Sequence, residues 1–347
     1  MEDVLVIVAP GVVADAGLLA EIAAREFAAL GTRGRLAYAR DSAHLRALAR
    51  QGDTVVVLTG SDEREPALTG PSVLVRAVLD RADGAPHIHG RGIEGLAWAI
   101  RHAAHRAGHP DVRRIPYGPS PEQWADLYLP DPVTSAAVPV VALVHGGYWR
   151  SIWAADTVES LCAGLAGRGL AVWNLEYRRP DLHTWATTVQ DVTAGLAALH
   201  AAGHPLLDLG RVAVAGHSVG AQLALRAIAD GARASLAVSL AGVLDLVQCE
   251  RRWMSNGAVA AAMGPAGGDL RASSPLLRLP LGVPQLVVQG ADDDLDLVDF
   301  GRRYARAASE AGDEVTYLEM PGGHFEVIAP DTPICESAID AIAAALR

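Results

Sequence analysis

Apolar residues fall in short uninterrupted runs along this chain, and segments with helical periodicity separate the runs from one another. Runs without polar alternation are typical of parallel strands that are buried on both faces. In the first part of the chain we expect strands at residues 4–9, 34–39 and 54–60. Helices are expected there near residues 16–30, 41–50, 71–82 and 92–107. This order predicts a small α/β domain over residues 1–110.

A stretch rich in proline and glycine, residues 109–139, follows this unit and predicts a linker that leads into a second domain, 111–347. The alternation then resumes, with strands expected at residues 125–130, 138–146, 170–177, 211–217, 235–242, 284–290 and 314–320. Helices are expected between them near residues 156–168, 187–203, 219–231, 297–312 and 334–346. Residues 248–281 break the rhythm and are a candidate cap over a site.

The most informative motif is Gly216-His217-Ser218-Val219-Gly220, which lies between an apolar strand and an Ala- and Leu-rich helix. In this context a serine occupies a sharp, strained turn that exposes its hydroxyl above the sheet, and the flanking glycines leave room for the tight backbone. A serine becomes a nucleophile only when a neighbouring base takes its proton. A base and an acid are therefore expected at the ends of later strands.

Both partners follow in the order that a nucleophile elbow requires, acid first and histidine second. The strand PQLVVQG runs into Asp292, Asp293 and Asp294, and the strand EVTYLEM runs into a Gly-Gly turn and His324. Each of the three aspartates is a candidate acid at this stage. Asp245, after an earlier strand, is a weaker alternative.

An early strand ends in His145-Gly146-Gly147-Tyr148-Trp149, where adjacent glycines let backbone N–H groups turn toward a developing oxyanion. The predicted donors are the N–H groups of Gly147, Tyr148 and Val219. Loss of such a donor typically lowers the rate by about 10²–10³-fold. Trp149 and Trp153 are candidates for substrate contact, with core packing as the alternative.

Composition narrows the class of protein further. Half of the residues are hydrophobic and the net charge is −11, which argues against nucleic acid or an anionic membrane as a partner. Three scattered cysteines fit a reducing cytoplasm and neither a disulfide framework nor a metal site. An acidic start and the lack of a long apolar run predict no signal peptide and no bilayer span. We expect a cytoplasmic protein without a cofactor, and a homo-oligomer is compatible with the sequence.

Four motifs together, HGGYW, GHSVG, the turn from Gly290 to Asp293 and GGHF, resemble the α/β-hydrolase fold over about residues 113–347. More narrowly they are similar to kynurenine formamidases (arylformamidases) and to carboxylesterases of the hormone-sensitive-lipase type. HGGYW, where many esterases have three glycines, leans toward the formamidases, whereas the sequence after the acid departs from theirs. The resemblance implies Ser218 as nucleophile, His324 as base and, by the family's Gly-x-x-Asp spacing, Asp293 as acid. The expected substrate is a small ester or an aryl formamide.

The N-terminal segments 4–11 and 87–102 resemble parts of type II 3-dehydroquinate dehydratases, which implies a flavodoxin-like fold. The loop at residues 9–15 has neither the arginine nor the tyrosine on which that chemistry depends. The expected fold is therefore an α/β-hydrolase domain preceded by a smaller, catalytically inactive flavodoxin-like domain. A bifunctional enzyme with a live dehydratase, or a ligand-binding protein on a hydrolase fold, are the alternatives.

Overall fold

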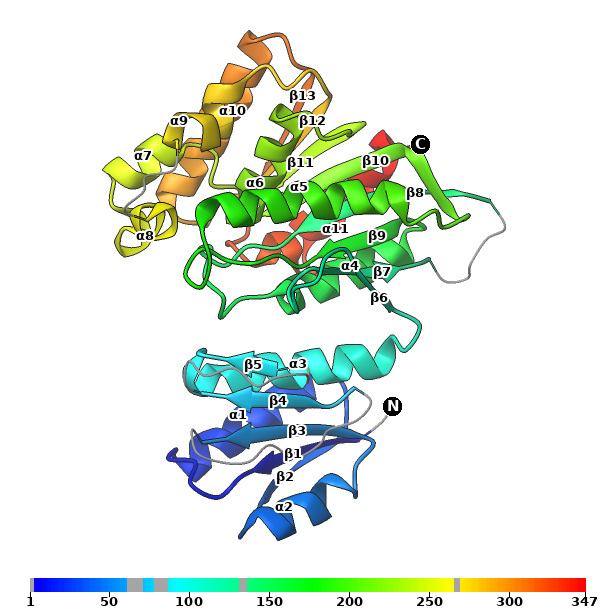
Figure 1. The fold of residues 1–347 in the computed structure, drawn as a ribbon, viewed down its shortest axis with the longest axis vertical. Coiled ribbons are helices and arrows are strands. Elements are labelled where there is room, and N and C mark those ends of the chain that lie inside the picture. The colour runs from blue at the N-terminus through cyan, green and yellow to red at the C-terminus, as the bar shows by residue number, and fades with distance from the viewer. Residues whose placement is uncertain (1–2, 61–70, 78–86, 131–135, 265–268) are drawn as a thin grey trace. The chain divides into compact units, whose positions relative to one another are not determined.

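The computed structural model describes residues 3–60, 71–77, 87–130, 136–264 and 269–347. Contacts within the chain divide it into two units, Met1–Asp111 and Val112–Arg347. This division lies next to the boundary that the proline-rich stretch predicts. Each unit has its own sheet and its own apolar core, and each is described by itself (Figure 1).

The N-terminal unit is a parallel sheet of five strands in the order β2-β1-β3-β4-β5. Its strands are β1 (Val4–Val8), β2 (Gly34–Tyr38), β3 (Thr54–Thr59), β4 (Val73–Arg76) and β5 (His87–His89). Its helices are α1 (Ala16–Ala29), α2 (Ser42–Ala49) and α3 (Gly95–Gly108). The strand order 2-1-3-4-5 is that of flavodoxin-like proteins, so the expected fold class is confirmed for this unit.

The helix predicted near residues 71–82 is wrong. Val73–Arg76 forms β4, all four of its residues are buried, and it pairs in parallel with β3 on one side and β5 on the other. A short apolar run has no periodicity that separates a strand from a buried helix, and here the neighbouring strands decide. Residues 78–82 lie outside the described residues.

The C-terminal unit contains a sheet of eight strands in the order β13-β12-β11-β10-β8-β9-β7-β6. Pairing is parallel except that β7 runs antiparallel to β6 and β9. The strands are β6 (Arg113–Pro116), β7 (Trp124–Tyr128), β8 (Val138–Val144), β9 (Ala171–Leu175), β10 (Leu207–His217), β11 (Leu236–Leu240), β12 (Gln285–Gly290) and β13 (Val315–Met320). Sequence reasoning placed β6 in the linker, because prolines surround it. A proline is tolerated there because β6 is an edge strand.

Helices cover both faces of this sheet. On one face α4 (Glu159–Gly167) and α11 (Pro333–Ala345) share an apolar cluster with the strands. On the other face α5 (Trp185–Ala201), α6 (Val219–Ala229) and α10 (Leu295–Glu310) share a second cluster. Because both faces are buried, the central strands are apolar without alternation. No described helix is long and apolar enough to cross a membrane.

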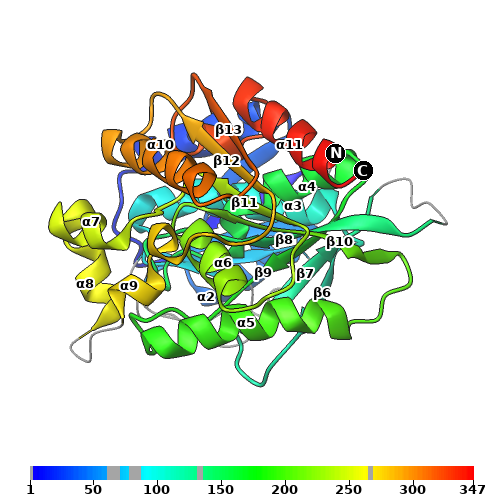
Figure 2. The same cartoon turned by 90° about the horizontal axis from the view of Figure 1, so that it is seen from above.

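The candidate cap lies between β11 and β12. Its described part consists of α7 (Leu246–Arg251), α8 (Ala258–Met263) and α9 (Leu270–Ser273), with short 3₁₀ turns at Met254–Asn256 and Pro275–Arg278. The three helices gather side by side in both views (Figures 1 and 2). This segment packs against the helix that follows the nucleophile elbow, since the Gln222 amide on α6 donates to the carbonyl of Ser273 at 2.8 Å.

Candidate active site

Ser218 stands at the junction between β10 and α6, with a backbone φ of 56° that is unusual for a residue other than glycine. The two flanking glycines explain how the chain tolerates this turn. A Cβ at Gly216 would lie 2.2 Å from the carbonyl oxygen of Gly220, and a Cβ at Gly220 would lie 2.1 Å from that of Val144. Strand and helix therefore cross too closely for side chains, and the strained turn between them carries the serine.

His324 and Asp293 are brought together from the ends of β13 and β12. The imidazole Nδ1 lies 2.9 Å from the Asp293 Oδ2, and the carboxylate is nearly inaccessible to solvent. A carboxylate only accepts, so Nδ1 carries the hydrogen and the neutral ring keeps its lone pair on Nε2. Burial alone would raise the pKa of Asp293. The hydrogen bond from His324 and the N–H groups of Asp294 and Gln289 outweigh burial, so the pKa lies below its ordinary value.

The other candidate acids have different partners. Asp292 accepts the N–H of Gly322 at 2.9 Å and so shapes the loop before His324. Asp294 caps the N-terminus of α10. Asp245 caps α7 and forms an ion pair with an arginine of α10 at 3.0 Å. Of the four carboxylates, the structure places Asp293 against the histidine.

His217 joins the serine turn to the histidine loop. Its ring lies 4.7 Å from the ring of His324, and its Nε2 donates to the His324 carbonyl oxygen at 3.0 Å. Burial, with a contribution from the charge of His324, lowers the pKa of His217 to about 3. His217 is therefore neutral at physiological pH and acts as a hydrogen-bond donor beside the nucleophile.

The HGGYW loop, residues 145–149, lies directly against Ser218. A Cβ at Gly146 would be 2.9 Å from the Ser218 Cβ. The following residues Gly147, Tyr148 and Trp149 all have positive φ values, 119°, 54° and 56°. Val219 is the first residue of α6, where backbone N–H groups have no acceptor within the helix. Its N–H group and the loop are thus positioned on the same serine turn.

The two tryptophans of this region pack around the loop. Trp149 is 2% exposed, donates its indole N–H to Gln222 at 3.2 Å and packs edge-on against Trp185. Its ring therefore lies in the core, which was the alternative to substrate contact, and contact of either tryptophan with substrate stays a prediction. Trp153 supports the loop, since a Cβ at Gly147 would lie 2.2 Å from the Trp153 Cβ.

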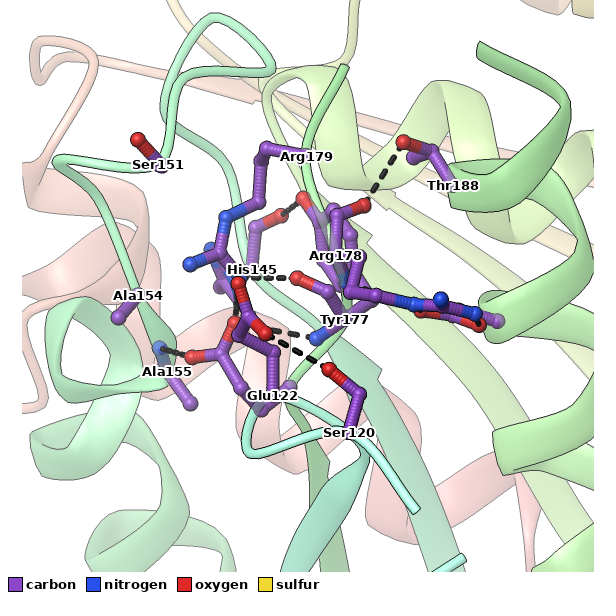
Figure 3. Close-up of polar contacts among 12 residues, drawn as sticks. Ser120, Glu122, His145, Ser151, Ala154, Ala155, Tyr177, Arg178, Arg179 and Thr188 are labelled. Atoms are coloured by element: carbon purple, nitrogen blue, oxygen red, sulfur yellow. Dashed lines mark hydrogen bonds and ion pairs between the residues drawn. The ribbon is translucent and has the colours of Figure 1, made fainter. Parts of the chain in front are cut away.

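Sequence reasoning missed two kinds of residue near the site. Phe325 is half-exposed and packs edge-on against His324, so it is an aromatic side chain available to a substrate. Glu176, Tyr177 and Arg179, just after β9, are buried, and Glu176 and Tyr177 contact His145. Figure 3 shows Tyr177 and Arg179 close to His145. The signal for this second group was a pair of opposite charges, Glu-x-x-Arg, directly after an apolar strand.

Comparison with known proteins agrees with this architecture. A family model for the α/β hydrolase fold matches residues 141–328, more than half of the chain. Esterase LipC of Mycobacterium tuberculosis is 26% identical over 238 residues, which cover 61% of this chain and 59% of that protein. An acetyl-hydrolase of Streptomyces hygroscopicus is 30% identical over 250 residues, which cover 62% of this chain and 82% of that protein.

Among solved structures, a bacterial heroin esterase superposes with a TM-score of 0.59 and 25% identity, over 72% of this chain and 91% of that one. Thermogutta terrifontis esterase 2 has a TM-score of 0.55 and 19% identity over 67% of this chain and 92% of that one, and supports the fold alone. The chain spans 59% of the length of LipC and 43% of that of the related esterase LipI. On the family match and the strand order, the chain belongs to the α/β hydrolase family.

Proposed function

We propose that this protein is a serine hydrolase that cleaves small carboxylic esters through an acyl-enzyme intermediate. The observation that carries the proposal is the His324–Asp293 hydrogen bond of 2.9 Å. His217, next to the strained Ser218 turn, donates to the His324 carbonyl and so links this pair to the serine. The similarity to two mycobacterial esterases and an acetyl-hydrolase supports the same reaction class.

In the proposed reaction the Ser218 Oγ attacks the substrate carbonyl carbon while His324 Nε2 takes the hydroxyl proton. Asp293 holds the required tautomer and stabilises the imidazolium. The N–H groups of Gly147, Tyr148 and Val219 donate to the tetrahedral oxyanion. His324 then gives its proton to the leaving alcohol. Water attacks the acyl-enzyme, His324 acts again as base, and the carboxylic acid and free serine result.

An aryl formamide is the second substrate class, because HGGYW resembles the formamidase motif and the same groups could protonate a departing aryl amine. No dehydratase activity is proposed for the flavodoxin-like unit, since the loop at residues 9–15 has no arginine or tyrosine. Turnover of 3-dehydroquinate by the full chain would overturn that view.

A fluorophosphonate probe and p-nitrophenyl acetate or butyrate test the nucleophile directly. Wild type should be labelled and active, and Ser218→Ala should be neither. Ser235→Ala is the matched control, because the Ser235 hydroxyl, just before β11, donates to the backbone carbonyl of Val212 in β10. A wild type that takes up no probe and turns over no ester would refute the proposal. A strong preference for N-formylkynurenine over the esters would assign the formamide as substrate.

A further inference from the structure

A buried charged group lies beneath the start of the HGGYW loop. Glu176 and Arg179 are 2% and 3% exposed and form an ion pair. Tyr177, between them in the sequence, is fully buried, and Figure 3 shows it beside His145 and Arg179. Two charges buried in this way cost several kcal/mol of desolvation, and an apolar pair of similar volume is often as stable. Fold stability alone is therefore a weak reason for the pair, so we examined what it holds in place.

Tyr177 holds His145 in two ways. Its hydroxyl donates to the His145 carbonyl oxygen at 2.8 Å, and the two rings stack with centroids 4.5 Å apart. His145 in turn holds the next peptide, because its Nδ1 lies 2.7 Å from the carbonyl oxygen of Gly146. A carbonyl oxygen only accepts, so Nδ1 is the donor in this contact.

This last hydrogen bond bears on the oxyanion site. The carbonyl of Gly146 and the N–H of Gly147 belong to one planar trans peptide, in which they point in opposite directions. Whatever fixes the carbonyl therefore also fixes the direction of the Gly147 N–H, the proposed oxyanion donor. Donation to the carbonyl also polarises that N–H and strengthens it as a donor.

Glu176 completes the arrangement. Its carboxylate accepts the N–H groups of Tyr177 at 3.0 Å and of Ala155 at 2.9 Å, and its Oε1 lies 3.4 Å from the His145 Nε2. The carboxylate therefore contacts the ring of His145 on the side opposite to the Gly146 carbonyl. The ion pair with Arg179 keeps Glu176 in this place.

We propose that Tyr177 and the buried Glu176–Arg179 pair are positioning residues for the oxyanion site and act through His145. The proposal rests on the esterase function proposed above. It predicts that a change in Tyr177 lowers stabilisation of the transition state more than binding of the ground state, because the Gly147 N–H matters most when the oxyanion forms.

Two matched substitutions test it. Tyr177→Phe removes the hydrogen bond to His145 and keeps the ring. Tyr304→Phe is the control, because the buried Tyr304 hydroxyl also makes one hydrogen bond, to the Gln285 side-chain oxygen at 2.8 Å, with no part in the Glu176–Arg179 arrangement. We expect Tyr177→Phe to lower kcat by about tenfold, part of the loss seen when a donor is removed, with KM within about twofold. Affinity for a trifluoromethyl ketone, which forms a tetrahedral adduct, should fall by the same factor. Tyr304→Phe should change neither quantity by more than about twofold.

An equal loss of kcat in both variants, or a loss confined to KM, would overturn the proposal. If Tyr177→Phe does not fold, a comparison of His145→Asn with His145→Ala tests the proposal. Both variants lose the imidazole ring, but Asn keeps an N–H donor near the position of Nδ1. Higher kcat in His145→Asn than in His145→Ala supports the proposal, and equal values refute it. An inactive wild type would refute the proposed function itself, whereas an active wild type with unchanged variants would refute this inference alone.

Discussion

His217 should make the stability of the hydrolase unit strongly dependent on pH in mildly acidic solution. Its side chain is buried beside Ser218, and its pKa is lowered to about 3, first by burial and then by the charge of His324. In the unfolded chain a histidine titrates near 6.5. Between these two values the unfolded state binds a proton that the folded state cannot accept.

The sign and size of the effect follow from that difference. Where the unfolded state binds more protons than the folded state, lowering the pH lowers the free energy of unfolding. The stabilising contribution of neutral His217 is therefore complete above pH 6.5 and is lost as the pH falls toward 3. Within this window, each pH unit changes the free energy of unfolding by at most about 1.4 kcal/mol for one titrating group. From pH 7.5 to pH 5.0, His217 alone should therefore lower the free energy of unfolding by about 2 kcal/mol.

Urea denaturation at pH 7.5 and pH 5.0, followed by tryptophan fluorescence, measures this quantity. Six of the seven tryptophans lie in the C-terminal unit, so the signal reports chiefly on that unit. His217→Gln removes the titrating group and keeps a side-chain N–H donor for the His324 carbonyl. Its loss of stability between the two pH values should be smaller than the wild-type loss by about 2 kcal/mol. His204→Gln, at a partly exposed histidine, is the control. Parallel losses in wild type and His217→Gln would refute the reasoning.

Four further substitutions probe the site. Asp293→Asn should lower kcat by about 10⁴-fold because it favours the wrong tautomer of His324, while Asp292→Asn should keep kcat within about tenfold in the same p-nitrophenyl ester assay. Gly147→Ala keeps the N–H group but places a Cβ 2.2 Å from the Trp153 Cβ at a backbone φ of 119°, so the loop and its donor must move. This should lower kcat by up to about 10²–10³-fold and reduce stability by about 1–3 kcal/mol in thermal unfolding. Gln222→Leu leaves a buried indole N–H and a carbonyl unpaired, so urea denaturation should show a loss of about 1–3 kcal/mol.

The features that were predictable from sequence are those set by short-range interactions. The serine turn needs glycine at positions 216 and 220 because the backbone crosses itself there, and that need is visible as GxSxG between a strand and a helix. The uninterrupted apolar runs of β8, β10 and β12 gave the buried parallel sheet in the same way. Burial on both faces leaves a direct mark on local sequence.

Features that depend on contacts between distant segments were not predictable. The local pattern of residues 73–76 predicted part of a helix, but in the structure they form a strand because β3 and β5 pair with them on either side. Trp149 suggested substrate contact, but Gln222 and Trp185, far away in the sequence, hold it in the core. A local pattern shows that a side chain is apolar, and the fold decides what it touches.

The sequence by itself determined the reaction class that we propose, because a nucleophile, a base and an acid at successive strand ends can be recognised from order alone. The family resemblance pointed to Asp293, and the tertiary structure shows that this carboxylate is the one that contacts His324. Only the tertiary structure revealed the buried pair beneath the oxyanion loop. Asp292, Asp293 and Asp294 have identical side chains, which differ only in the direction in which the backbone points each carboxylate. A hydrogen bond requires alignment within a few tenths of an ångström, and that alignment is set by how β12 and β13 pack together.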